Sequence, residues 1–136
     1  MRCIIFVLIL FSAPSFSSGY CVDLDGFKVD KVEEQPWFDI SISELNGKYS
    51  IVFKVPKIKE NEQFEWASFA FAQDNWEDMN LYVPLATGEQ ENTRVGTFFF
   101  DKHLLDKVWL ILSYSSCESE YIFKLSDVVN TVGIER

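Results

Sequence analysis

The sequence lacks most of the motifs from which catalytic and metal sites are built. It has a single histidine, His103, and no Gly-rich phosphate loop, G-x-S-x-G elbow, H-E-x-x-H helix or C-x-x-C pair. These absences weigh against the common nucleotide, hydrolase and metalloprotease sites. We therefore expect no catalytic residues, no cofactor and no metal. The alternative is a small hydrolase in which His103 acts as a general base.

Positive charge is also scarce. The chain has 12 Lys and Arg residues against 21 Asp and Glu residues, which gives a formal net charge of -9 at pH 7. Such a charge repels phosphate backbones and anionic lipid surfaces. Nucleic acid is therefore not expected as a partner, whereas a basic protein is attracted at long range.

No hydrophobic run is long enough to span a bilayer. The longest runs from Cys3 to Phe11; it follows the basic Arg2 and precedes small residues and one proline that end at Gly19. This arrangement is typical of a secretory signal peptide. We expect residues 1–19 to be removed and residues 20–136 to form one domain without a membrane span. That domain is then secreted or periplasmic.

Cysteine is rare, and its positions favour one disulfide. Cys3 lies in the predicted signal peptide, so Cys21 and Cys117 are the cysteines that remain in the domain. Two cysteines in an oxidising compartment are typical of a disulfide. Together with His103 they cannot supply the four ligands of a zinc site without carboxylates. We expect a Cys21–Cys117 bridge that ties the start of the domain to a late hairpin.

Aromatic and β-branched residues, in contrast, are abundant, and they mostly alternate with polar residues. The clearest example is segment 38–55, in which Asn46-Gly47 is typical of a two-residue hairpin turn. The register that this turn predicts separates an apolar face from a polar face. Its pairs are Asp39 with Lys54, Ile40 with Phe53, and Ile42 with Ile51.

Further alternating segments extend the strand pattern along the chain. They are residues 22–29, 64–72, 79–85 and 94–100, and a late hairpin with its loop at Ser116–Ser119 that pairs Tyr114 with Tyr121 and Leu112 with Phe123. No sustained helical stripe is found, and the tail from Ser126 to Arg136 fits either a last strand or a loose end. Seven to eight strands favour an all-β, antiparallel two-sheet β-sandwich of immunoglobulin-like architecture. A small antiparallel β-barrel is the alternative.

Large apolar residues on strand faces that should be polar are the first candidate binding site. They are Phe98, Phe100, Trp109, Ile111, Ile122 and Trp66. Exposed together, they would form an aromatic patch, which usually marks a binding surface. The alternative is that they belong to central strands covered on the second face by the N-terminal segment, the tail or a long loop.

An oxygen-rich loop around an indole is the second candidate. It consists of Asp74, Asn75, Trp76, Glu77 and Asp78. The loop could hold calcium or present Trp76 to a sugar ring, but it lacks the spacing of a calcium-binding loop. A solvated turn is the simpler interpretation.

Charge and aromatic content together favour a non-catalytic binding module. We expect recognition or inhibition of a basic extracytoplasmic protein, steered by charge and then held by a desolvated apolar contact. The alternative is carbohydrate binding by stacking on Trp66, Trp76 or Trp109.

Overall fold

The computed structural model describes residues 31–33, 35–114 and 119–135. Within these ranges the chain is mostly β-structure, which confirms the predicted all-β class. Its elements in chain order are β1 (Lys31–Val32), β2 (Asp39–Leu45), β3 (Lys48–Pro56), β4 (Ile58–Lys59), β5 (Glu62–Phe71), the 3-10 helix η1 (Trp76–Asp78), β6 (Leu81–Leu85), β7 (Thr87–Gln90), β8 (Thr93–Asp101), the 3-10 helix η2 (Lys102–Lys107), β9 (Val108–Tyr114), β10 (Ser119–Lys124) and the helix α1 (Leu125–Val132).

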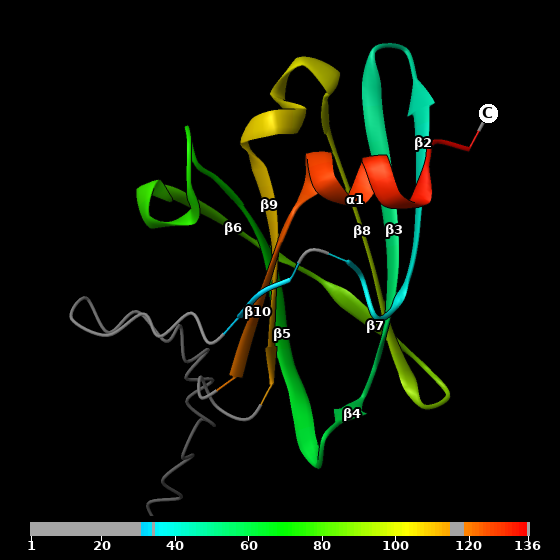
Figure 1. The fold of residues 1–136 in the computed structure, drawn as a ribbon. Helices are drawn as coiled ribbons and strands as arrows, with labels where there is room; N and C mark the ends of the chain where they lie inside the picture. The colour runs from blue at the N-terminus through cyan, green and yellow to red at the C-terminus, as the bar shows by residue number, and fades with distance from the viewer. Residues whose placement is uncertain (1–30, 34, 115–118, 136) are drawn as a thin grey trace, which may run out of the picture.

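The strands form two sheets that pack face to face (Figure 1). One sheet has the order β2-β3-β8-β7; the other has the order β1-β10-β9-β5-β4, with β6 also paired to β5. All pairs are antiparallel except the short β1, which runs parallel to β10. Immunoglobulin domains have strands A-B-E-D in one sheet and C-F-G in the other. Read as strands A to G, β2, β3, β5, β7, β8, β9 and β10 reproduce that order, with β6 added beside β5. The predicted sandwich is confirmed, and the barrel alternative is wrong.

The β2–β3 hairpin turns at Asn46-Gly47 as predicted. Both residues have positive φ, 52° and 77°, which a type I′ turn requires and which asparagine and glycine accept. The observed pairs are Asp39 with Lys54, Ile40 with Phe53, and Ile42 with Ile51. The predicted register is therefore confirmed.

The β9–β10 hairpin has a different register from the one predicted. Leu112 pairs with Tyr121, and Tyr114 pairs with Ser119, so each partner lies two positions earlier in the chain than expected. A shift of two residues leaves every side chain on the same face of its strand. The apolar pattern therefore predicted the inner and outer faces of this hairpin correctly but its residue pairs wrongly.

The core lies between the two sheets. Alternate residues of both sheets point inward and are almost completely buried; they include Tyr114, Phe53, Phe123, Ile42, Ile51, Leu110 and Leu112. Phe69 of β5 and Phe98 of β8 stack across the sandwich, with ring centroids 5.1 Å apart and an interplanar angle of 10°. Burial of these side chains is the main favourable contribution to folding.

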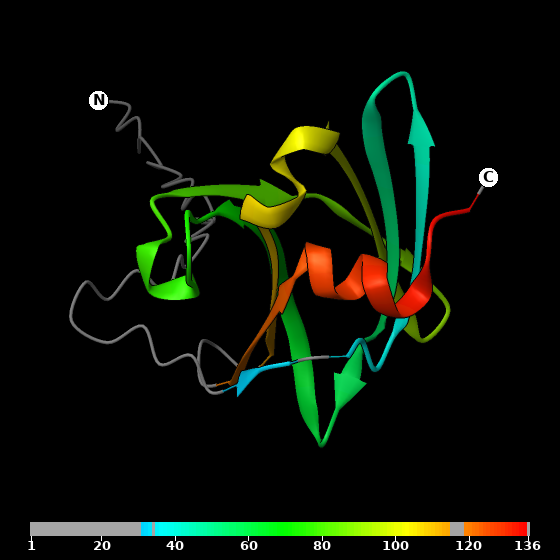
Figure 2. The same ribbon diagram turned by 45° about the horizontal axis from the view of Figure 1, so that its top comes forward.

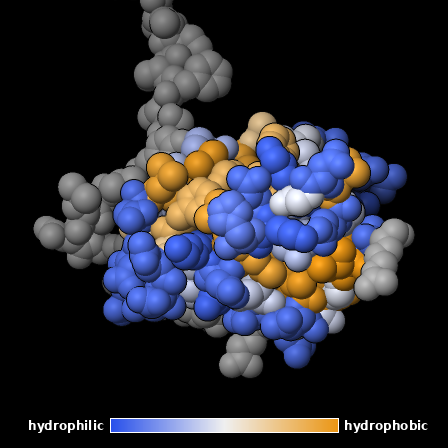
Figure 3. Space-filling view, turned by 90° about the horizontal axis from the view of Figure 1, so that it is seen from above, coloured by the Kyte–Doolittle hydropathy of each residue, from blue (hydrophilic) through white to orange (hydrophobic). Residues whose placement is uncertain are grey.

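The tail contains the helix α1, so neither of the two predicted alternatives, a last strand or a loose end, is correct. The tail runs from β10 to the edge of β2, where the Glu135 amide donates to the Ile42 carbonyl at 2.7 Å. α1 thus covers the side of the sandwich between the two sheets (Figure 2). Leu125 and Val128 of the helix are buried against the core. Seen from above, apolar surface lies between hydrophilic side chains at this end of the molecule (Figure 3).

Several predictions fall outside the described residues. They are the signal peptide at 1–19, the strand at 22–29, and both cysteines of the predicted disulfide, Cys21 and Cys117. Among the residues that are described, no helix combines the length and the apolar character that a membrane span requires.

Candidate functional site

The outer face of the β2-β3-β8-β7 sheet carries exposed apolar side chains, and we term it the open face. Because Ile42, Ile51 and Phe98 point into the core, the residues next to them along each strand point outward. The open face includes Asp39, Ser41, Ser43, Leu45, Lys48, Ser50, Val52, Lys54, Val95, Thr97, Phe99 and Asp101.

Phe99 lies on the open face near the end of β8, beyond residues 93–96, with which β7 pairs. It is 68% exposed, although it lies within a regular strand between two buried phenylalanines. Its cross-strand partner on β3 is Ser50, whose small side chain leaves the ring uncovered. Val52, two positions along β3, is exposed as well. Burial of a phenylalanine side chain is favourable by roughly 2 kcal/mol, so a partner that covers Phe99 gains that free energy.

Charged side chains of both signs lie on the open face together with Phe99 and Val52. In the observed register Lys54 lies opposite Asp39, and Lys48 lies opposite Asp101. Lys48 Nζ also lies 5.6 Å from the centroid of the Phe99 ring, within the range of a cation–π contact. The open face is therefore locally balanced in charge, although the whole chain is strongly acidic.

A groove of about 590 Å³ adjoins the open face at the β2–β3 turn. It is lined by Glu44, Asn46, Val129, Gly133, Ile134 and Glu135. Outside the groove, Lys102 Nζ lies 2.9 Å from Glu44 Oε1, and this hydrogen bond raises the pKa of Lys102. None of the lining residues is basic, so the groove extends the acidic surface to the edge of the open face.

The predicted aromatic patch is not a single surface. Phe98 and Phe100 point into the core and are 4% and 5% exposed, so they do not contribute to an exposed patch. Side chains alternate along β8, and this alternation places Phe99 outside instead. Pairing β8 with β3 would have identified Phe99 from sequence, because its partner Ser50 lies on the polar face of the β2–β3 hairpin.

The four other patch residues, Trp109, Ile111, Ile122 and Trp66, lie together on the outer face of the second sheet, which we term the covered face. Trp109 is 5% exposed, and Ile111 and Ile122 are fully buried. Trp66 reaches this face through an irregularity in β5 between Phe64 and Trp66. These residues form a second buried cluster, which matches the alternative of covered central strands.

The loop at 74–78 folds back onto the covered face. Asn75 Oδ1 accepts a hydrogen bond from the Glu77 amide at 2.8 Å and caps η1. Trp76 packs against the buried cluster, whereas the acidic side chains of the loop are exposed. Among the described residues, no group of three or more His, Cys, Asp and Glu side chains is placed to hold a metal ion.

His103 lies on η2. Its side chain is exposed, and within the described part of the chain it makes no hydrogen bond or ion pair. A histidine that acts as a general base in a triad is oriented by an acid and faces a nucleophile. The described surroundings of His103 supply neither.

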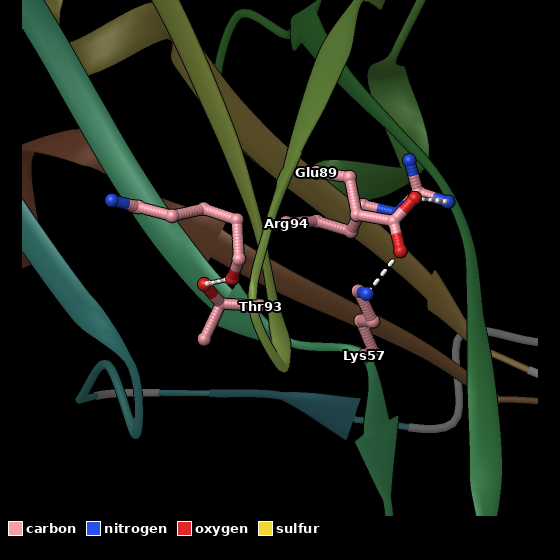
Figure 4. Close-up of polar contacts among 5 residues, drawn as sticks. Lys57, Glu89, Thr93 and Arg94 are labelled. Carbon is pink, nitrogen blue, oxygen red and sulfur yellow. Dashed lines mark hydrogen bonds and ion pairs between the residues drawn. The ribbon is translucent and has the colours of Figure 1, made fainter.

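Polar contacts fix the β7–β8 hairpin beside the open face (Figure 4). Glu89 forms an ion pair with Lys57, and Arg94 Nη2 lies 3.9 Å from Glu89 Oε2. The hydrogen bond from Lys57, followed by the charges of Lys57 and Arg94, lowers the pKa of Glu89. Thr93 Oγ1 donates to the Gln90 carbonyl at 2.6 Å. These contacts hold the edge strand β7, which the sequence analysis did not predict, in register with β8.

Comparison of the chain with protein-family models, with curated proteins and with solved structures finds no match. The strand order and the exposure of the outer faces describe the protein as a β-sandwich of immunoglobulin topology, with one open and one covered outer face.

Proposed function

We propose that the protein is an exported, non-catalytic binding module that recognises a basic extracytoplasmic protein through the open face. The observation that carries the proposal is the exposure of Phe99 within a regular strand of the open face. Phe99, Val52 and Leu45 supply apolar contact area, and the serine and threonine hydroxyls around them supply a polar rim. An aromatic anchor within a polar rim is typical of a protein interface.

The net charge of -9 supports a basic partner. Opposite charge accelerates association, most strongly at low ionic strength. The open face itself does not oppose such a partner, because its lysines lie opposite aspartates. Charge therefore governs the association rate, whereas the contact with Phe99 slows dissociation.

The proposal includes export and a Cys21–Cys117 disulfide. β1 is parallel to β10, with Lys31 beside Tyr121. Parallel strands start at the same end of a sheet, so β1 begins at the end of the sheet where β10 begins. In the sequence, Cys117 lies between β9 and β10, and Cys21 lies ten residues before Lys31 of β1. Intact mass under non-reducing conditions tests the bridge, because oxidation removes two hydrogens from the exported chain.

The two other functions that the sequence left open gain no support from the geometry. Sugar stacking needs an exposed ring face, whereas Trp109 is buried and Trp66 and Trp76 pack against the same cluster. A hydrolase needs a partner for His103, and the described residues supply none.

Bait proteins that differ in one exposed side chain test the proposal. Wild type, Phe99→Ser and Leu81→Ser are immobilised and exposed to the extracellular fluid of the source organism. Leu81→Ser is the control, because Leu81 is also an exposed apolar residue but belongs to β6 of the other sheet. We expect wild type and Leu81→Ser to retain the same basic protein at low salt and Phe99→Ser to lose it.

The retained protein is then purified and its affinity is measured. Loss of an aromatic anchor costs on the order of 2 kcal/mol, so we expect Phe99→Ser to bind about thirtyfold more weakly. Equal retention by all three baits, or retention of acidic proteins alone, would contradict the proposal.

A further inference from the structure

The covered face is buried although it is an outer face of the sandwich. Its residues form three cross-strand rows across β5, β9 and β10: Trp66-Ser113-Glu120, Ser68-Ile111-Ile122 and Ala70-Trp109-Lys124. All of these side chains except Trp66 and Lys124 are almost completely buried, including the polar Ser68, Ser113 and Glu120. A sheet face in contact with water would leave them accessible, so a further layer lies over this face.

The covered face also buries polar atoms that lack hydrogen-bond partners among the described residues. They are the hydroxyl oxygens of Ser68 and Ser113 and the indole Nε1 atoms of Trp66 and Trp109. Buried polar groups are nearly always hydrogen-bonded. Carbonyl groups of an extended segment across the face would accept from both indoles and both hydroxyls. The missing layer therefore consists of groups that offer hydrogen-bond acceptors as well as apolar contacts.

The elements that the structure describes supply only part of this layer. Trp76 and Met79, from the connection between β5 and β6, pack against the buried cluster. α1 is engaged elsewhere, because Leu125 and Val128 pack into the core between the sheets.

We propose that residues 20–30 of this chain lie across the covered face. These residues immediately precede β1, which is paired with β10 at the edge of the same sheet. Extended, a segment of this length reaches roughly 35 Å, whereas the strands from β10 to β6 span about 15 Å. The segment is therefore long enough to cross the face. Its apolar residues suit the tryptophan and isoleucine side chains beneath: Val22, Leu24, Phe27 and Val29.

This layer makes the covered face part of the fold and unavailable to a partner. The inference does not depend on the proposed role of the open face. It concerns the other sheet, and it holds whether or not Phe99 contacts a partner.

Hydrogen exchange of the exported protein tests which chain covers the face. We expect peptides from residues 20–30 to exchange at least about a hundredfold more slowly than an unstructured chain. The protection is expected to be equal at low and high protein concentration. Exchange at the unstructured rate would overturn the proposal, and so would protection seen only at high concentration, which would identify a second copy as the cover.

Acrylamide quenching of tryptophan fluorescence tests where the segment lies. Three of the four tryptophans, Trp66, Trp76 and Trp109, belong to the cluster of the covered face. We expect Phe27→Ala to raise the quenching constant at least about twofold, because loss of the ring opens a path to the indoles. Lys28→Ala is the matched control and is expected to leave it unchanged.

Both variants are compared after circular dichroism shows that they are folded. Val29→Ala replaces Phe27→Ala if the latter does not fold. Equal quenching in wild type and in the folded apolar variant would show that the segment does not cover the tryptophans, and would overturn the proposal.

Discussion

The ring of Phe53 lies over the backbone of Gly96, its cross-strand partner in the β3–β8 pair. A Cβ atom on Gly96 would lie 2.6 Å from Phe53 Cε1 and still closer to Cζ. Phe53 is fully buried, so its ring cannot move aside without displacing the core around it. The position of the Phe53 ring beside β8 therefore requires glycine at position 96.

Gly96→Ala is predicted to lower the free energy of unfolding by about 1–3 kcal/mol, because the added methyl group overpacks the core. Gly88→Ala in the adjacent β7 is the control, since a Cβ there meets nothing closer than 3.9 Å. Urea denaturation of both variants measures the difference. Identical midpoints for Gly96→Ala and wild type would show that the ring of Phe53 has room to move.

The hairpin that contains Phe53 could be predicted from sequence because two independent signals agree there. Asn46-Gly47 specifies the turn, and the alternation of residues around Ile42 and Ile51 specifies the face. In the β9–β10 hairpin the loop carries no such turn signal. Alternation alone cannot distinguish registers that differ by two residues, which is why Leu112 was paired wrongly.

Tyr114 links the two sheets through one hydrogen bond. It is fully buried in β9, and its hydroxyl donates to the Pro56 carbonyl at the end of β3 at 2.7 Å. Tyr114→Phe is predicted to lower the free energy of unfolding by about 1 kcal/mol. Tyr49→Phe is the control, because the Tyr49 hydroxyl makes no hydrogen bond with the described residues. Equal losses in chemical denaturation of the two variants would contradict a specific role for the Pro56 contact.

Alkaline pH is predicted to weaken the fold through the same tyrosine. Burial, followed by the nearby Tyr121, raises the pKa of Tyr114 well above its usual range. The unfolded chain loses the phenol proton near pH 10 (about the ordinary tyrosine pKa), whereas the folded chain retains it. Stability is therefore complete below about pH 10 and falls as the pH rises further. The fall is expected to be smaller in Tyr114→Phe, and an equal slope in both proteins would refute the assignment.

Lys59 connects β4 to the β10 edge through two aromatic rings. Its Nζ lies 4.7 Å from the ring centroid of Trp37 and 4.5 Å from that of Tyr121. Partial burial by itself lowers the pKa of Lys59, but hydrogen bonds to Glu60 and Tyr121 raise it overall. We predict that Lys59→Met lowers the free energy of unfolding by about 1 kcal/mol. Lys48→Met, which removes an exposed cation from the Phe99 ring, is expected to have little effect. The thermal midpoints of the two variants make the comparison.

The helix α1 and the position of Phe99 show what local patterns leave undetermined. Helical spacing is present in α1, at Leu125, Val128, Val129 and Val132. Three of these residues are valine, however, and β-branched valine favours strands, so the segment did not stand out as a helix. The run Phe98-Phe99-Phe100 is equally ambiguous. Alternation places Phe99 on one side of the strand and its two neighbours on the other, but the local sequence does not say which side faces the core. Pairing with β3 decides it, and that contact joins segments far apart in the chain.

The same limit applies to the covered face. Trp109, Ile111 and Ile122 were assigned correctly to the outer side of their strands. Whether an outer side meets water depends on a layer from elsewhere in the chain, and no periodicity in β9 or β10 encodes that layer. Burial of this cluster could therefore be stated from sequence only as an alternative.

The dissociation constant of the retained basic protein for wild type and Phe99→Ser, at low and high salt, tests the central claim most directly. We predict about thirtyfold weaker binding by Phe99→Ser at both salt concentrations, slower association of both proteins at high salt, and an unchanged free energy of unfolding, because Phe99 is exposed. Equal dissociation constants in the two proteins would contradict recognition through the open face.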